Sequence, residues 1–127
     1  MSPKALAVLL AVAGALGGCG NPDVERGDAL ARQHRWTEAV EVYVRALDRY
    51  PYEYDAAWGI ARIYCHEVHL ADKCLAWTDR LLAAYPRRRA YRRAAAQGWR
   101  DRAAEARTTG DAAAAGTAEQ RAAELER

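Results

Sequence analysis

The chain has 127 residues, which is room for one small domain. Hydrophobic residues make up 51% of it, but 30 positions are alanine and phenylalanine is absent, so the core has to be built from small aliphatic side chains with four Trp and seven Tyr as the large fillers. The 19 basic and 17 acidic residues nearly cancel, which gives no reason to expect nucleic-acid binding, and four Pro and nine Gly are too few for turn-rich β structure.

The first residues have the pattern of an export signal. Lys4 supplies a positive charge, and residues 5–16 are twelve apolar residues without a charge. A helix of that length reaches about 18 Å, whereas a bilayer span needs roughly 20 residues. A secretory signal is therefore favoured over a permanent transmembrane helix.

The apolar run ends in the sequence LGGC at residues 16–19, which resembles the lipobox of bacterial lipoproteins. The resemblance implies that residues 1–18 are a signal peptide cut before Cys19, and that Cys19 carries a diacylglyceryl group and an acyl chain such as palmitate. The two acyl chains of the diacylglyceryl group and the third acyl chain would together anchor the protein permanently in the membrane. Gly20, in place of Asp, at the second mature position implies the outer membrane, facing the periplasm. The alternative is a secreted protein with a chance cysteine near its cleavage site.

Residues 19–21 leave almost no linker between the expected lipid and the folded domain. Asn21 can cap a helix that has Pro22 at its first position. We therefore expect a helical domain over residues 22–127 that begins only a few residues from the headgroups.

The chain then repeats itself at a spacing of 35 residues. Residues 36–51 and 71–86 both carry apolar residues at helical spacing and end in Tyr-Pro, where proline stops the helix. Identical pairs at this spacing include His34 and His69, Arg45 and Arg80, Leu47 and Leu82, Tyr50 and Tyr85, and Pro51 and Pro86. A period in the mid-thirties predicts an array of helix-turn-helix hairpins.

This pattern resembles tetratricopeptide repeats, which place small residues where paired helices cross and end in proline. The first repeat fits best, at Gly27, Ala39, Tyr43, Ala46 and Pro51. The second repeat is looser and needs a one-residue insertion; its matching or substituted positions are Ala61, Tyr64, Cys74, Thr78, Leu81 and Pro86. The third repeat fits at Trp99, Ala103, Gly110-Asp111, Ala115 and Ala122.

The resemblance implies an all-α fold of about three antiparallel hairpins, stacked as a short right-handed solenoid. The repeats would cover approximately residues 20–53, 54–88 and 96–127. An unrelated antiparallel helical bundle is the alternative. Because Gly116 interrupts an Ala-rich last helix and no polar capping helix follows, we expect that helix to fray or to be completed by a partner.

Two cysteines remain after Cys19, and an even number in an exported protein favours a disulfide. Cys65 lies near the end of one expected helix and Cys74 early in the next, so both can face one seam. Two free thiols, or a zinc site, are the alternatives, because the possible metal ligands cluster here: Cys65, His66, Glu67, His69, Asp72 and Cys74. The disulfide is preferred, and no metal site is predicted.

Catalytic motifs are missing from the chain. There is no Gly-rich phosphate loop, no HExxH and, after the leader, no serine. His34 and His69 are interpreted as polar turn residues. We therefore expect a protein that is not an enzyme and has no cofactor beyond the covalent lipid on Cys19.

Charge is unevenly distributed along the chain. Residues 80–107 hold nine Arg against two acidic residues, whereas residues 20–79 hold seven basic and eleven acidic residues. The centre of the positive segment is a basic patch formed by Arg87, Arg88, Arg89, Arg92 and Arg93. It predicts contact with an acidic protein surface or anionic headgroups, unless it is only a solvated helix face with a coding bias.

Tetratricopeptide arrays bind partners in a groove lined by the first helix of each hairpin. Carried onto this chain, the resemblance implies the groove residues Asp28, Arg32, Asp55, Trp58, Arg62, His66, Arg100 and Arg107. We expect a membrane-anchored lipoprotein adaptor that binds a protein partner, not nucleic acid, and helps to assemble, stabilise or localise a cell-envelope complex. The alternatives are a permanent structural subunit of an envelope machine or an exported metal-binding protein.

Overall fold

The computed structural model describes residues 20–127, so the predicted signal peptide and the lipid on Cys19 lie outside the described residues. No strand occurs among residues 20–127, and the predicted all-α fold is confirmed. The elements in chain order are α1 (Pro22–Arg32), α2 (Trp36–Arg49), α3 (Tyr54–Arg62), the π-helical turn η2 (Ile63–Glu67), α4 (Ala71–Ala84), α5 (Arg89–Thr108) and α6 (Ala112–Leu125).

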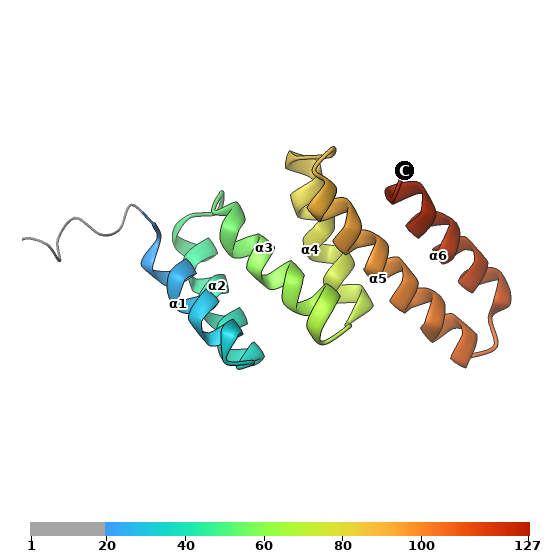
Figure 1. Cartoon of the computed structure of the whole chain (residues 1–127), viewed down its shortest axis with the longest axis horizontal. Helices are drawn as coiled ribbons and strands as arrows, with labels where there is room; N and C mark the ends of the chain where they lie inside the picture. Colours follow the sequence, from blue (N-terminus) through green and yellow to red (C-terminus); the bar gives the residue numbers. More distant parts are fainter. Residues whose placement is uncertain (1–19) are drawn as a thin grey trace, which may run out of the picture.

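The helices form an elongated row in which each one packs against the next (Figure 1). In addition, α1 contacts α3, and α3 contacts α5. Odd-numbered helices begin, and even-numbered helices end, at the upper edge of the row in Figure 1. This upper edge consists of residues 20–21, 50–53, 85–88 and 126–127. The opposite, lower edge carries the turns inside each hairpin.

Helix boundaries follow local chemistry. The Asn21 side chain accepts a hydrogen bond of 3.0 Å from the Asp23 N–H, and Pro22 takes the first helical position, as predicted. At their other ends, α2 and α4 both stop immediately before a Tyr-Pro pair. The third hairpin begins at Arg89, ahead of residue 96 where the sequence repeat was placed, because Arg and Ala are good helix formers and nothing interrupts them.

The turns at the lower edge share one backbone conformation. His34, His69 and Gly110 have φ values of 58°, 52° and 78°, the left-handed region that ends many helices. At the first turn the Arg35 N–H reaches back to the Leu30 carbonyl at 3.0 Å, which satisfies a free carbonyl of α1. The recurrence of histidine in the sequence therefore marks equivalent turns, as expected.

The turn η2 sits where the second repeat needed an extra residue. Its Val68 N–H bonds to the Ile63 carbonyl at 2.9 Å, five residues back instead of four. A π-helical turn holds one more residue than an α-helical one, so it accommodates an insertion without breaking the helix. The extended segment α3–η2 thereby keeps its packing against α4 and α5.

Close approach of the first three helices depends on glycine. Tyr43 of α2 is fully buried, with its ring between Gly27 of α1 and Gly59 of α3, and a Cβ atom at either glycine would overlap the ring. The Tyr43 side chain thus fills the space between two hairpins.

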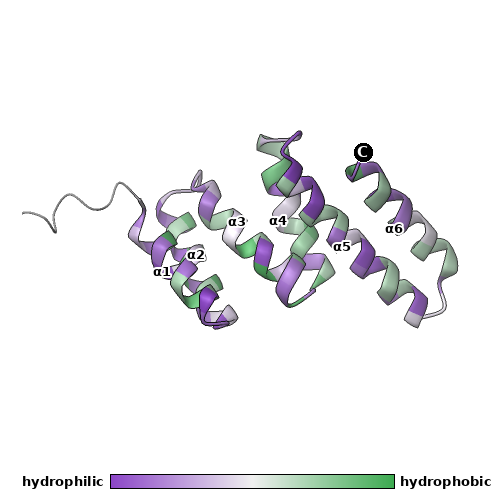
Figure 2. Ribbon diagram, in the orientation of Figure 1, coloured by the Kyte–Doolittle hydropathy of each residue, from purple (hydrophilic) through white to green (hydrophobic). Residues whose placement is uncertain are grey.

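The helices are amphipathic, with hydrophobic and hydrophilic residues alternating along each of them in Figure 2.

The predicted disulfide between Cys65 and Cys74 is confirmed, with the two Sγ atoms 2.12 Å apart. It ties η2 to α4 close to the turn between them, and both cysteines are buried. Gly98 of α5 packs directly on it, since a Cβ there would lie 2.6 Å from the Cys74 Sγ. The free-thiol alternative is therefore wrong, and thiolates are not available for a zinc site.

Candidate functional site

A cleft of about 390 Å³ lies between α1 and α3, toward the lower edge. We call it the mixed cleft, because it has two acidic and two arginine side chains beside a tryptophan wall. Its lining residues are Asp28, Ala31, Arg32, His34, Trp36, Gly59, Arg62, Ile63 and Glu67. Three of the predicted groove residues, Asp28, Arg32 and Arg62, meet here.

Asp28 is held in the mixed cleft from two sides. The buried Tyr43 hydroxyl donates a hydrogen bond to its carboxylate, and the Arg62 guanidinium lies 3.9 Å from the same oxygen. Burial raises the pKa of Tyr43, and the hydrogen bond to Asp28 raises it further, so the phenol remains a neutral donor at physiological pH. The core side chain between the glycines therefore also orients a surface carboxylate.

Trp58 does not stand free on a groove wall. Its side chain is half-buried and packs against the core, with its ring centroid 5.1 Å from that of Tyr91 on α5. The Arg62 guanidinium lies over the Trp58 ring, 5.7 Å from its centroid. Trp58 therefore joins the second and third hairpins and supports the arginine that a ligand would meet.

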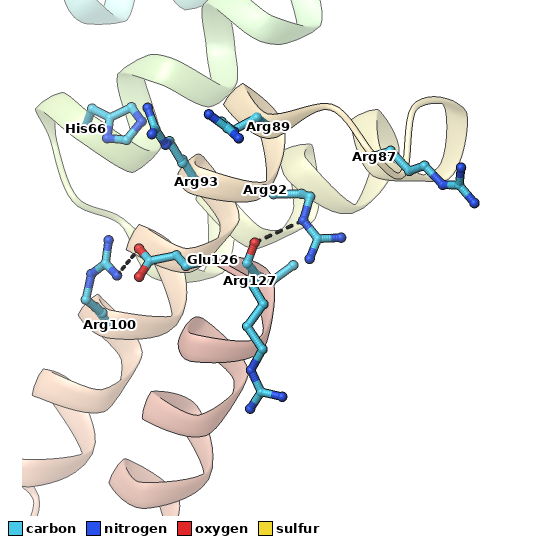
Figure 3. A pocket seen from close by; sticks show the side chains of 9 residues that line it. His66, Arg87, Arg89, Arg92, Arg93, Arg100, Glu126 and Arg127 are labelled. Carbon is cyan, nitrogen blue, oxygen red and sulfur yellow. Dashed lines mark hydrogen bonds and ion pairs between the residues drawn. The ribbon is translucent and has the colours of Figure 1, made fainter.

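A larger cleft of about 910 Å³ lies between η2, the start of α5 and the end of α6 (Figure 3). We call it the basic cleft, because six arginines and one histidine line it against one glutamate. The lining residues are His66, Arg87, Arg89, Arg92, Arg93, Arg100, Leu125, Glu126 and Arg127. It combines His66 and Arg100 from the predicted groove with four residues of the predicted basic patch.

The remaining predicted residues lie elsewhere. Asp55 lines neither cleft, and Arg107 pairs with Glu119 of α6. The guanidinium of Arg88 stacks over Tyr85 and Tyr91, at 5.9 and 5.1 Å from their ring centroids. Five of the eight groove positions are thus divided between two separate clefts, and the other three, Asp55, Trp58 and Arg107, line neither.

The cations of the basic cleft differ in how they are compensated. Arg92 donates hydrogen bonds to the Leu125 and Glu124 carbonyls at 3.0 and 3.2 Å, and Arg100 pairs with Glu126. In contrast, no carboxylate of the described residues lies within ion-pair distance of the arginines Arg87, Arg89 and Arg93. The cleft therefore keeps an excess of positive charge.

His66 lies in this field. Burial lowers its pKa below the ordinary value, and the neighbouring His69 and Arg100 lower it further, against the opposite effect of Glu67 and Asp101. A histidine in this environment is neutral at physiological pH. It can donate or accept a hydrogen bond while the arginines supply the charge.

Charged side chains of both signs line each of the two clefts. Over residues 20–127 no group of three or more His, Cys, Asp or Glu side chains is placed to hold a metal ion, and neither cleft contains a Ser or Cys in its lining. No helix in this part of the chain is both long and apolar enough to cross a membrane. What the two clefts can do is bind charged groups.

Several residues that build the site were missed from the sequence. Gly59 and Gly98 set how closely α3 and α5 approach their neighbours, and Arg127 lines the basic cleft. A glycine inside a helical pattern is a signal for close packing, and both glycines carried that signal. The contribution of Arg127 was missed because the third repeat was placed from residue 96, so the end of α6 was not matched with an α5 that begins at Arg89.

No protein-family model matches the chain, and neither the curated proteins nor the solved structures contain a significant match. Function is therefore inferred from the sequence motifs and the two clefts.

Proposed function

We propose that this chain is a non-catalytic lipoprotein adaptor, anchored through Cys19 to the outer membrane and facing the periplasm. Its hairpins, stacked as a short right-handed solenoid of tetratricopeptide type, bind a protein partner and help to assemble, stabilise or localise a cell-envelope complex. The mixed cleft is the observation that carries this proposal. It lies between the first helices of successive hairpins, where such arrays hold their ligands.

The packing pattern supports a repeat array. Helices contact their neighbours in the chain, and first helices of successive hairpins contact each other, as α1 does with α3 and α3 with α5. Equivalent left-handed turns at His34, His69 and Gly110 close the three hairpins. Because a left-handed residue ends many helices, the contacts between successive first helices carry more weight for the array than the turns do.

The chemistry of the mixed cleft suits a peptide segment that carries both charge signs. Arg32 and Arg62 can meet an acidic side chain, Glu67 a basic one, and the Trp36 ring can cover an apolar side chain between them. Because Tyr43 and Arg62 hold Asp28 in place, part of the ordering cost is met before the ligand arrives.

The test of the cleft is a crosslinking pulldown from membranes. Arg32→Ala/Arg62→Ala is expected to remove the specific partner, whereas the control Arg45→Ala/Arg121→Ala, which changes two exposed arginines outside the mixed cleft, is expected to keep it. Trp58→Ala is a poor probe, because it removes packing between hairpins. An identical partner list for both double variants would refute the cleft as the binding site.

The anchor has its own test. The mature protein is expected to begin at Cys19 with its acyl groups in an intact-mass measurement, and Cys19→Ser is expected to release the protein from membranes. A mature chain without acyl groups would rule out the lipoprotein assignment and leave the mixed cleft to be judged separately.

A permanent structural subunit is the second candidate, and the third hairpin favours it. α6 buries only Ala115, Ala118 and Ala122, a thin interface that a neighbouring subunit could reinforce. The test is to add free protein to the isolated complex. An adaptor that is bound in the complex is expected to exchange with the added protein, whereas a permanent subunit is not. The metal-binding alternative loses support, because the disulfide occupies Cys65 and Cys74.

A further inference from the structure

The basic cleft is a second site, distinct from the mixed cleft to which a protein partner is assigned. It begins at the upper edge and runs along α5 to His66 and Arg100. In Figure 3 the side chains of Arg89 and Arg93 lie on the His66 side of the cleft, whereas Arg87 points away from it. Arg92 and Arg100 lie nearer to the end of α6.

The arginines of this cleft repel one another in the free protein. Arg92 and Arg100 are committed to the end of α6, but Arg89 and Arg93 have no acidic partner within 4 Å in the described chain. Both also lie at the start of α5, which has no acidic residue in its first turn and no side-chain cap. The positive end of the helix dipole adds to their charge, so an anion placed here relieves repulsion.

Phosphate fits these donors better than a carboxylate does. Two guanidinium groups that project together can each present two N–H groups, which matches the several oxygens and the charge of a phosphate group. The neutral His66 ring adds a hydrogen bond without adding to the repulsion. A volume of about 910 Å³ leaves room for a phosphate together with the group that bears it.

The source of the phosphate follows from the upper edge. This edge includes Gly20, next to the cysteine proposed to carry lipid, together with the exposed Tyr50, Tyr52 and Tyr85, which are 60%, 82% and 44% exposed. Tyrosine is enriched where membrane meets water, since its ring is apolar and its hydroxyl is polar. Anionic phosphate is the dominant charged group at the same depth.

We propose that the basic cleft binds a phosphate group, and that an anionic lipid headgroup supplies it, so that the upper edge lies against the membrane. This inference rests on the membrane attachment proposed above. With the upper edge against the membrane, the mixed cleft, which lies near the lower edge, faces away from the bilayer and is accessible to a partner. The acyl anchor would fix one end of the row, and the basic cleft would fix the other.

The test uses the full chain in bilayer discs of phosphatidylcholine, with or without phosphatidylglycerol, and with a spin label on some headgroups. Amide signals at the start of α5 are expected to broaden several-fold more in discs that contain phosphatidylglycerol. Arg89→Glu/Arg93→Glu is expected to lose this difference, and the control Arg45→Glu/Arg121→Glu, with the same change in charge, to keep it. Circular dichroism verifies that both variants are folded.

Equal broadening in the two kinds of disc, or equal loss in the two double variants, would overturn the proposal. In a second arm, pyrophosphate is titrated into the chain in phosphatidylcholine discs. If pyrophosphate shifts the signals of Arg89, Arg93 and His66 while phosphatidylglycerol has no effect, the phosphate is soluble and the headgroup assignment is wrong. Intact mass is measured first, so that a missing anchor is not mistaken for a missing headgroup contact.

Discussion

The first two hairpins and the third are held together by different means. The largest fully buried side chains, among them Tyr43, Ile60 and Leu81, all belong to α2, α3, η2 and α4, and the disulfide lies in the same region. In α6 every buried residue is alanine. An alanine interface lets two helices approach closely, but it removes little apolar surface from water per residue.

Polar contacts compensate for part of this difference. Arg92 of α5 donates to two carbonyls at the end of α6, and two ion pairs link the same helices, Arg100 with Glu126 and Arg107 with Glu119. Exposed ion pairs contribute only about 0.2 to 1 kcal/mol each. The basic cleft is therefore formed largely by the end of the molecule that buries fewer large side chains.

The largest expected effect concerns the disulfide in the more stable region. Cys65→Ala/Cys74→Ala is expected to lower the free energy of unfolding by about 2.5 to 3 kcal/mol, since the bond closes a loop of about ten residues. Urea titration measures it, and reductant should lower the stability of the wild type but not that of the double variant. If both proteins respond equally to reductant, the bond does not contribute in this way.

Glycine substitutions separate the two regions more sharply. Gly27→Ala is expected to cost about 1 to 3 kcal/mol, because its Cβ would overlap the Tyr43 ring. Gly116→Ala in α6 is expected to gain about 0.5 to 1 kcal/mol, since no atom lies within 4 Å of its added Cβ. Thermal unfolding gives both values, and a loss of stability for Gly116→Ala would contradict the open surface around α6.

Removal of the α5 arginine that donates hydrogen bonds to the end of α6 tests how that helix is attached. Arg92→Ala is expected to cost about 1 kcal/mol, because two carbonyls lose a charged donor. Hydrogen exchange should become severalfold faster in α6 and remain unchanged in α2. The same acceleration in both helices would mean that the row unfolds as one cooperative unit.

The smallest effect is a pH dependence at the junction of the two regions. Because the pKa of His66 is lowered in the folded protein, the unfolded state binds its proton more readily, and stability falls as pH drops below the ordinary histidine range. Arg100→Gln is expected to raise the pKa of His66, since one of the cations that lowers it is removed. NMR titration of the imidazole measures this, and an unchanged or lower pKa would show that Arg100 is not one of the groups that depress it.

Local signals in the sequence predicted much of the fold. Pro51 and Pro86 ended helices, Asn21 and Pro22 began one, and the placement of Cys65 and Cys74 on either side of a turn predicted their bond. Each of these depends on a few neighbouring residues. Such features can be inferred from residue types and spacing alone.

The division of the groove into two clefts could not be predicted in the same way. Spacing places Trp58 and Arg62 on one helix face, but whether a ring is free or packed depends on the distance to the next hairpin. Two close contacts set that distance: Gly59 packs on Tyr43, and Gly98 packs on the disulfide. The Arg-rich start of α5 was likewise assigned to a surface patch, because the third repeat was placed from residue 96 and the helix was not expected to begin at Arg89 beside the end of α6.

The contact of Gly98 with the Cys65–Cys74 bond has a consequence for the order of folding. The third hairpin packs, through Gly98, on the Cys65–Cys74 disulfide, and this bond exists only after the two thiols have been oxidised. In a reduced chain, the first hairpin, which does not contact this bond, would therefore assemble without delay, and the last hairpin would dock only after oxidation.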